Sequence, residues 1–289
     1  MGKSATMTRR LGLAAIAASL TTACSPLSLF ATLSPKDPAM TSARDVAFGP
    51  DPRQRLDVYA PKGARVAPVV MFFYGGSWDT GRRQDYNWVG KALASRGFVT
   101  VIADYRLYPE VRFPGFLEDG ALATRWAVDH AAQFGGDPTR IALVGHSAGA
   151  YNAAMLALDT RYLTAAGVDP RRVKAFAGLS GPYDFLPLTD PIAIRTFGEA
   201  KDLPATQPTR FVRADAPATF LATGEKDTYV FPRNTVRLAK ALREVGVTVE
   251  ERHYPEVDHV NMVLALSRPL RGRAPVFEEM VAFLKAHIA

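Results

Sequence analysis

Residues 145–149, Gly-His-Ser-Ala-Gly, constrain the fold of this 289-residue chain more than any other stretch of its sequence. The pentapeptide occurs once, directly after the apolar run 141–144, and it leads into segment 148–158, which has the composition of a helix. A serine between a strand and a helix lies in a sharp, strained turn, and side chains at the flanking glycine positions would clash. This context predicts that Ser147 is a nucleophile. The alternative is a glycine-rich turn with an idle serine.

Strand-like and helix-like segments alternate along the rest of the chain. Apolar or alternating runs predict strands over residues 54–60, 68–74, 98–103, 140–144, 173–179, 219–223 and 247–254. Helical spacing predicts helices over residues 86–96, 114–134, 148–158, 233–244 and 276–286. The alternation predicts an α/β fold with a mostly parallel sheet and helices on both faces, so sites should lie at the carboxyl ends of strands. The proline-rich segment 181–217 is predicted to be irregular.

A serine hydroxyl needs a base that accepts its proton before it can attack a carbonyl carbon. His259 lies after the last predicted strand and before the last predicted helix, where the chain order serine, acid, histidine places the base. The other histidines occupy a helix, the pentapeptide, a strand and the C-terminus: His130, His146, His253 and His287. We therefore predict His259 as the base, with a solvated loop histidine as the alternative.

The acid should follow a strand between the serine and the histidine. Asp227 comes just after the predicted strand 219–223, 80 residues after Ser147 and 32 before His259. Its carboxylate would hold the imidazole tautomer and stabilise the imidazolium. The rival acids are Glu225, Asp184 and Asp258.

Residues 74–78, Tyr-Gly-Gly-Ser-Trp, follow the predicted strand 68–74 and offer an oxyanion hole. An oxyanion hole needs backbone N–H groups aimed at the charge that develops on the carbonyl oxygen. We predict that the donors are Gly76 and Ser77, together with Ala148 after the nucleophile. The alternative is an ordinary glycine turn.

From about Asp57 onward, the chain resembles the carboxylesterase/lipase group of α/β-hydrolases, which includes hormone-sensitive-lipase-like and feruloyl/acetyl-xylan esterase-like enzymes. The motifs are residues 104–109 (Asp-Tyr-Arg-Leu-Tyr-Pro), 136–141 (Gly-Asp-Pro-Thr-Arg-Ile) and 74–78, where Tyr74 replaces the histidine of His-Gly-Gly-x-Trp. The resemblance implies an α/β-hydrolase fold with an eight-stranded-type sheet and a small cap. It also implies that Asp104 and Arg106 brace the oxyanion loop rather than react.

The activity that this resemblance implies is hydrolysis of short-chain or aryl carboxylic esters through an acyl-enzyme, with no metal and no cofactor. An arylformamidase-like amide hydrolase would share the same three residues. A non-catalytic binding protein on this fold would be expected to lack one of them. The short segment 181–217 weighs against the peptidases of this fold, which carry larger additions.

The N-terminus predicts export. Lys3, Arg9 and Arg10 precede an uncharged run of ten residues, 11–20, which is too short to span a bilayer. Cys24, the only cysteine, ends a stretch that resembles the lipobox of bacterial lipoproteins. We therefore expect a signal peptide over 1–23, a lipid anchor that binds a membrane facing the periplasm or the exterior, a tether over 24–45 and an α/β-hydrolase domain over 46–289. Simple cleavage would instead give a periplasmic or secreted protein.

The net charge of +7 does not argue for nucleic acid as a partner. Three of the positive charges belong to the predicted signal peptide, and their removal leaves +4. The chain has no run of lysine and arginine interleaved with aromatic residues, which a nucleic-acid site would need. The expected partner is a small-molecule ester.

Overall fold

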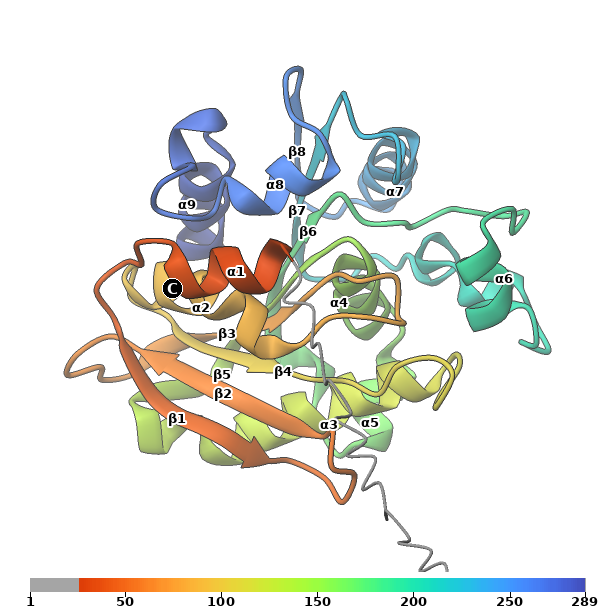
Figure 1. The fold of residues 1–289 in the computed structure, drawn as a ribbon. Coiled ribbons are helices and arrows are strands. Elements are labelled where there is room, and N and C mark those ends of the chain that lie inside the picture. Colours follow the sequence, from red (N-terminus) through yellow and green to blue (C-terminus); the bar gives the residue numbers. More distant parts are fainter. Residues whose placement is uncertain (1–25, 289) are drawn as a thin grey trace, which may run out of the picture.

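Eight strands form one sheet through the middle of the molecule (Figure 1). The structure is a computed structural model, and it describes residues 26–288. The strand order is β1-β2-β4-β3-β5-β6-β7-β8; β2 runs antiparallel to β1 and β4, and every other pair is parallel. The strands are β1 Met40–Ala47, β2 Arg55–Ala60, β3 Ala67–Phe73, β4 Val99–Ala103, β5 Gly136–His146, β6 Val173–Leu179, β7 Ala218–Gly224 and β8 Val249–Tyr254. The mostly parallel, eight-stranded sheet that the sequence predicted is confirmed.

Helices cover both faces of this sheet. They are α1 Pro26–Leu33, α2 Asn87–Ala94, α3 Gly115–His130, α4 Ala148–Leu158, α5 Thr160–Ala165, α6 Pro191–Phe197, α7 Arg233–Glu244, α8 His259–Leu264 and α9 Val276–Ile288. Successive residues of β3 enter opposite apolar layers: Phe72 belongs to the layer that includes residues of α2 and α9, and Phe73 to the layer that includes residues of α3 and α7. A strand covered on both faces is apolar along its whole length, which explains the unbroken run in β3.

The N-terminal part of the domain differs from the predicted tether. Within 26–45, the structure has helix α1 and the start of strand β1. Phe30 of α1 meets Trp88 of α2 edge-on, with ring centroids 5.5 Å apart, and β1 pairs with β2. Neither element has a strong local pattern, so tertiary contacts decide both. The predicted signal peptide and Cys24 lie outside the described residues, and residues 26–288 contain no helix long and apolar enough to cross a membrane.

Residues 181–217 form the cap, drawn in teal to green in Figure 1. They contain α6 and two 3-10 helices, Pro204–Thr206 and Pro208–Phe211, and otherwise no regular structure. This agrees with the expectation of an irregular segment. The cap leaves β6 at Leu179 and returns to β7 at Ala218, so it lies beside the carboxyl ends of the parallel strands.

Candidate active site

The structure brings together the three residues that the sequence nominated as nucleophile, base and acid. The Ser147 hydroxyl oxygen lies 2.8 Å from Nε2 of His259. On the other side of the imidazole, Nδ1 lies 2.7 Å from Oδ2 of Asp227. A hydroxyl, an imidazole and a carboxylate in one hydrogen-bonded line can move a proton from the serine to the histidine while the carboxylate stabilises the resulting charge.

The turn that carries Ser147 is as sharp as the pentapeptide predicts. Ser147 has φ 56° and ψ −127°, a backbone conformation that residues with a side chain rarely adopt. A Cβ on Gly149 would lie 2.0 Å from the backbone oxygen of Phe73, so only glycine fits between the turn and β3. Ala148 is the first residue of α4, where backbone N–H groups have no partner within the helix.

Asp227 is held as a carboxylate. Its Oδ1 accepts hydrogen bonds from the backbone N–H groups of Tyr229 at 3.0 Å and Val230 at 2.8 Å, which leaves Oδ2 for His259. Burial alone would raise the pKa of Asp227, but the hydrogen bond and charge of His259 and the Val230 N–H outweigh burial and place this pKa below its usual value.

The rival acids have other partners or positions. Asp258 accepts a hydrogen bond from the backbone N–H of Asn261 and so caps α8. Asp184 pairs with Arg237 at 2.8 Å. Glu225 follows β7 as Asp227 does, but its side chain is exposed.

His146 has a structural part in the site that the sequence did not show. Its Nε2 donates a hydrogen bond to the backbone oxygen of His259 at 2.9 Å, so the elbow holds the segment that positions His259. Burial, followed by the nearby charge of His259, lowers the pKa of His146 to about 3, and the ring is therefore neutral at neutral pH. The sequence predicted only that this residue packs under the turn.

The predicted oxyanion loop lies against the nucleophile. A Cβ on Gly75 would come within 2.9 Å of Cβ of Ser147. Gly76 and Ser77 follow with φ values of 128° and 51°, and both line the same cavity as Ser147 and Ala148. The structure therefore gathers the three predicted donors around the nucleophile.

Tyr74, which replaces the histidine of the family motif, is buried, and its contacts hold the oxyanion loop in place. Its ring stacks between Tyr86 and Tyr105, with centroid distances of 5.4 and 4.9 Å. Its hydroxyl donates to Oδ1 of Asp104 at 2.8 Å, and the Tyr105 hydroxyl donates to its backbone oxygen at 2.9 Å. Asp104 thus contacts the oxyanion loop, as predicted.

The prediction for Arg106 is wrong. Its guanidinium and its backbone N–H both bind the carboxylate of Asp119 on α3. The cation that meets Asp104 is instead Arg83, a buried residue whose Nε also lies 2.9 Å from Oδ1 of Asp57. Arg83 stands outside the family motifs, which explains why the sequence did not nominate it.

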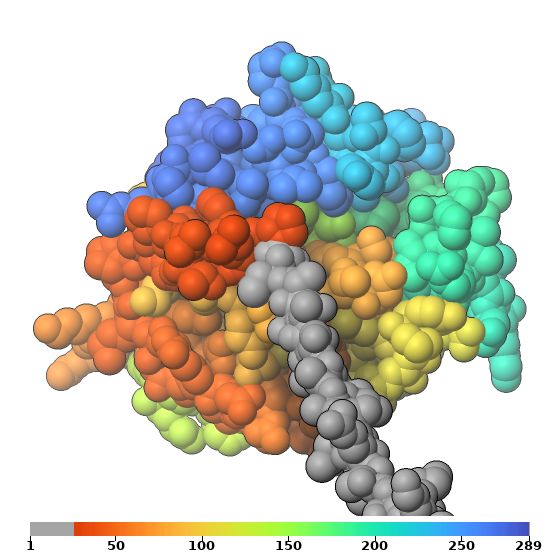
Figure 2. All heavy atoms as spheres, in the orientation of Figure 1, coloured from red at the N-terminus to blue at the C-terminus, as the bar shows by residue number. Residues whose placement is uncertain are grey.

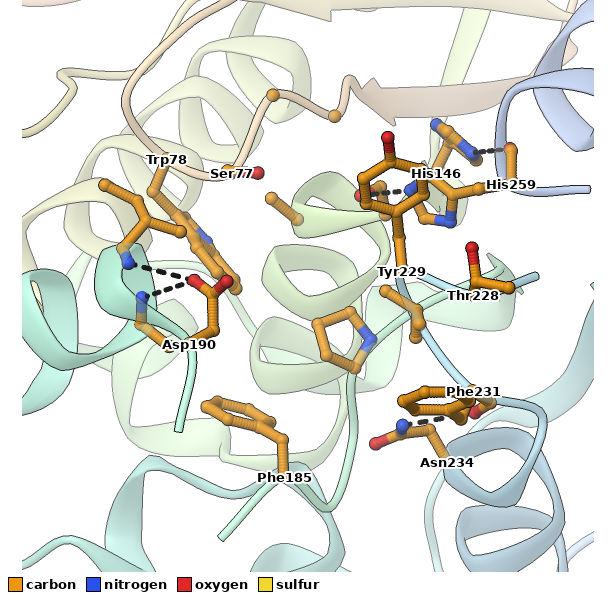
Figure 3. Close-up of a pocket in the computed structure, with 18 of the residues that line it drawn as sticks. Ser77, Trp78, His146, Phe185, Asp190, Thr228, Tyr229, Phe231, Asn234 and His259 are labelled. Carbon is orange, nitrogen blue, oxygen red and sulfur yellow. Dashed lines mark hydrogen bonds between the residues drawn. The ribbon is translucent and has the colours of Figure 1, made fainter. Parts of the chain in front are cut away.

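A cavity of about 710 Å³ opens above Ser147. Its walls come from the oxyanion loop, the elbow, the cap and the segments that follow β7 and β8. Figure 2 shows the molecule hollowed where the teal cap meets the orange loop and the blue C-terminal segments. In Figure 3, Trp78 and Asp190 lie on one side of the cavity, and His259, Thr228 and Tyr229 on the other. In residues 26–288, no cluster of three or more His, Cys, Asp or Glu side chains could hold a metal ion.

Comparison with known proteins finds relatives that are esterases. It matches the model of the BD-FAE family over residues 56–242. The isoprenylcysteine alpha-carbonyl methylesterase of Arabidopsis thaliana is 29% identical over 266 residues, which cover 84% of this chain and 62% of that protein. Esterase LipC of Mycobacterium tuberculosis is 38% identical over 151 residues, or 49% of this chain and 37% of LipC. The chain spans only 55% to 64% of the length of the plant methylesterases that it matches.

Solved structures show the same fold. Esterase B from Lactobacillus rhamnosis, inhibited by a tributyrin phosphonate, superposes with a TM-score of 0.76 at 24% identity and 90% coverage of both chains. A truncated carbohydrate esterase from gut microbiota gives a TM-score of 0.75 at 20% identity, covering 88% of this chain and 98% of that one. The predicted α/β-hydrolase fold is confirmed.

Proposed function

Because this chain belongs to the BD-FAE family, we propose that it is a serine carboxylesterase with Ser147 as nucleophile, His259 as base and Asp227 as acid. The observation that carries the proposal is the hydrogen-bonded line from Ser147 through His259 to Asp227, with distances of 2.8 and 2.7 Å. The resemblance to the carboxylesterase group supports the reaction type, since the relatives are esterases.

The reaction follows from the positions of these groups. His259 takes the proton of Ser147 as its oxygen attacks the acyl carbonyl carbon. The backbone N–H groups of Gly76, Ser77 and Ala148 stabilise the oxyanion of the tetrahedral intermediate. His259 then gives the proton to the departing alcohol, which leaves an acyl-enzyme. A water molecule, deprotonated by His259, releases the carboxylic acid and restores Ser147.

The substrates that this cavity favours are esters of short acyl chains. Each buried methylene contributes about 0.8 kcal/mol only where a wall covers it. The cap adds one short α-helix and two 3-10 helices, so it offers little wall beyond the cavity itself. We expect kcat/KM for p-nitrophenyl esters, measured from acetate to palmitate, to peak at about four carbons or fewer.

Three kinds of result would contradict this assignment. A peak at about ten carbons or more, or activation on emulsions, would show that the cap encloses a long chain. Hydrolysis of N-formylkynurenine faster than every ester would make the chain an arylformamidase-like amide hydrolase. A chain that a fluorophosphonate fails to label at Ser147 would be a binding protein on this fold.

We also propose that Cys24 carries the lipid anchor and that the enzyme faces the periplasm or the exterior. The support is the positive N-terminus, the short apolar run and the single cysteine. In a bacterial host, the full chain is expected in the membrane fraction, and Cys24→Ala is expected to be released or left unprocessed. Mass spectrometry of the mature protein gives the readout, and an unmodified form that starts at Cys24 or later argues against lipidation.

A further inference from the structure

Large apolar side chains stand exposed at the mouth of the cavity. Tyr229, Val260 and Phe231 expose 81%, 53% and 48% of their surface, and all three line the cavity above Ser147. Scattered exposed apolar residues are ordinary, but a cluster that continues a cavity marks a binding surface. These three residues, from the segments after β7 and β8, are called the outer wall below.

The outer wall contacts two of the residues that we propose for catalysis, His259 and Asp227. The ring of Tyr229 lies 5.7 Å from the imidazole of His259, between centroids, at an angle of 45°. The backbone N–H of Tyr229 is fixed on Asp227, so the ring is presented from a tethered turn. Val260 directly follows His259, and the guanidinium of Arg233 covers the ring of Phe231 at 5.0 Å. Figure 3 shows Tyr229 beside His259, across the cavity from Trp78.

The proton transfer from His259 determines whether the acyl part or the alcohol part of an ester contacts the outer wall. His259 must hand its proton to the oxygen of the departing alcohol, so that oxygen lies next to the imidazole. The alcohol therefore leaves past the outer wall, whereas the oxyanion loop and Trp78 border the other side of the cavity.

We infer that the outer wall is a leaving-group subsite for a flat aromatic ring, so that the substrate is the ester of an alcohol whose ring lies close to its hydroxyl. This inference rests on the proposed esterase function and deepens it. Tyr229 and Phe231 present exposed aromatic rings, on which another ring gains stacking in addition to burial. The outer wall has no side-chain amide or charged group for sugar hydroxyls, and the amide of Asn234, which also lines the cavity, already has partners. Oδ1 of Asn234 accepts from the backbone of Tyr183 and Asp184, and its Nδ2 donates to Phe231.

Three acetate esters test the inference: benzyl acetate, cyclohexylmethyl acetate and ethyl acetate. All three give the same acetyl-enzyme, so differences in kcat/KM report the leaving group alone. The benzyl and cyclohexylmethyl groups have the same number of carbons, and only the benzyl ring is flat. In the wild type, we expect kcat/KM for benzyl acetate to exceed that for cyclohexylmethyl acetate by about three- to tenfold.

Substitutions test whether the ring of Tyr229 causes the preference for benzyl acetate. Tyr229→Ala is expected to lower the benzyl-to-ethyl ratio of kcat/KM by about three- to tenfold, and Tyr229→Phe to retain most of it, because the ring and not the hydroxyl stacks. Val236→Ala is the matched control: Val236 is 44% exposed on α7 and does not line the cavity. This variant should leave both the ratio and the activity unchanged.

The contrary outcomes are distinct. An equal loss on all three esters in Tyr229→Ala would show that Tyr229 acts through His259, and an unchanged ratio would show that the wall does not bind a ring. Faster hydrolysis of a 6-O-acetylated methyl glucoside than of benzyl acetate would show that the outer wall binds a sugar ring rather than an aromatic one. Failure of the wild type on every ester, without fluorophosphonate labelling, would instead overturn the proposed function.

Discussion

Ser147→Ala and His259→Ala are each expected to lower kcat for p-nitrophenyl acetate by about four to six orders of magnitude. Without the hydroxyl no acyl-enzyme can form, and without the imidazole nothing within hydrogen-bond distance takes its proton, since the Ser147 oxygen lies 2.8 Å from Nε2 of His259. The double variant should lose little more than either single variant, because the residues act as a unit. Steady-state kinetics and fluorophosphonate labelling give the readout.

Asp227→Asn separates the proposed acid from its rivals. The amide keeps the size of the side chain but removes the negative charge, and we expect kcat to fall by about four orders of magnitude. Asp258→Asn is the matched comparison, because asparagine also caps a helix and Asp258 caps α8. A loss within about tenfold for Asp227→Asn would assign the acid elsewhere.

Ser95→Ala is the control for Ser147→Ala, because it also removes a serine hydroxyl. The hydroxyl of Ser95 only donates a hydrogen bond to the Ala92 carbonyl at the end of α2.

The core of the site could be predicted because local chemistry dictates it. The turn at Ser147 needs glycine at positions 145 and 149, where a Cβ would lie 2.2 and 2.0 Å from backbone oxygens, so five adjacent residues determine its geometry. Asp227 and His259 could be nominated because parallel strands bring their carboxyl ends to one edge of the sheet. Each follows a strand that is recognisable as an apolar or alternating run.

The supports of the site could not be predicted in the same way. Arg83 meets Asp57 and Asp104 across 26 and 21 residues of chain, and no spacing rule connects such groups. His146 bonds the backbone of His259, 113 residues away. Helix α1 has no strong pattern of its own and is held by the contact of Phe30 with Trp88. Such features come from tertiary packing, so sequence reasoning did not predict α1 and gave Arg106 a bracing role that Arg83 has.

Arg83→Met is expected to lower the free energy of unfolding by about 3–5 kcal/mol at neutral pH. The guanidinium is buried, and it pairs with the buried carboxylates of Asp57 and Asp104 and with the exposed Asp45. Burial alone would lower the pKa of Arg83, but the two buried carboxylates outweigh burial and raise it. Methionine fills similar space yet leaves two negative charges buried without a cation, and that cost sets the magnitude. Urea unfolding measures it as a shift of the midpoint.

Two comparisons make the Arg83 result specific. Arg171→Met breaks an exposed pair with Asp169, which solvent screens, and should leave the urea midpoint almost unchanged. Arg83→Met combined with Asp57→Asn should recover part of the stability, because one of the two unpaired buried charges is then removed.

Asp104 also accepts a hydrogen bond from the hydroxyl of Tyr74. We therefore expect kcat to fall in the folded Arg83→Met variant, because the oxyanion loop is then held less firmly. A loss of stability below about 1 kcal/mol would mean that water or a shifted side chain neutralises Asp57 and Asp104 without Arg83. The oxyanion loop would then depend on the stacking of Tyr74 between Tyr86 and Tyr105 instead.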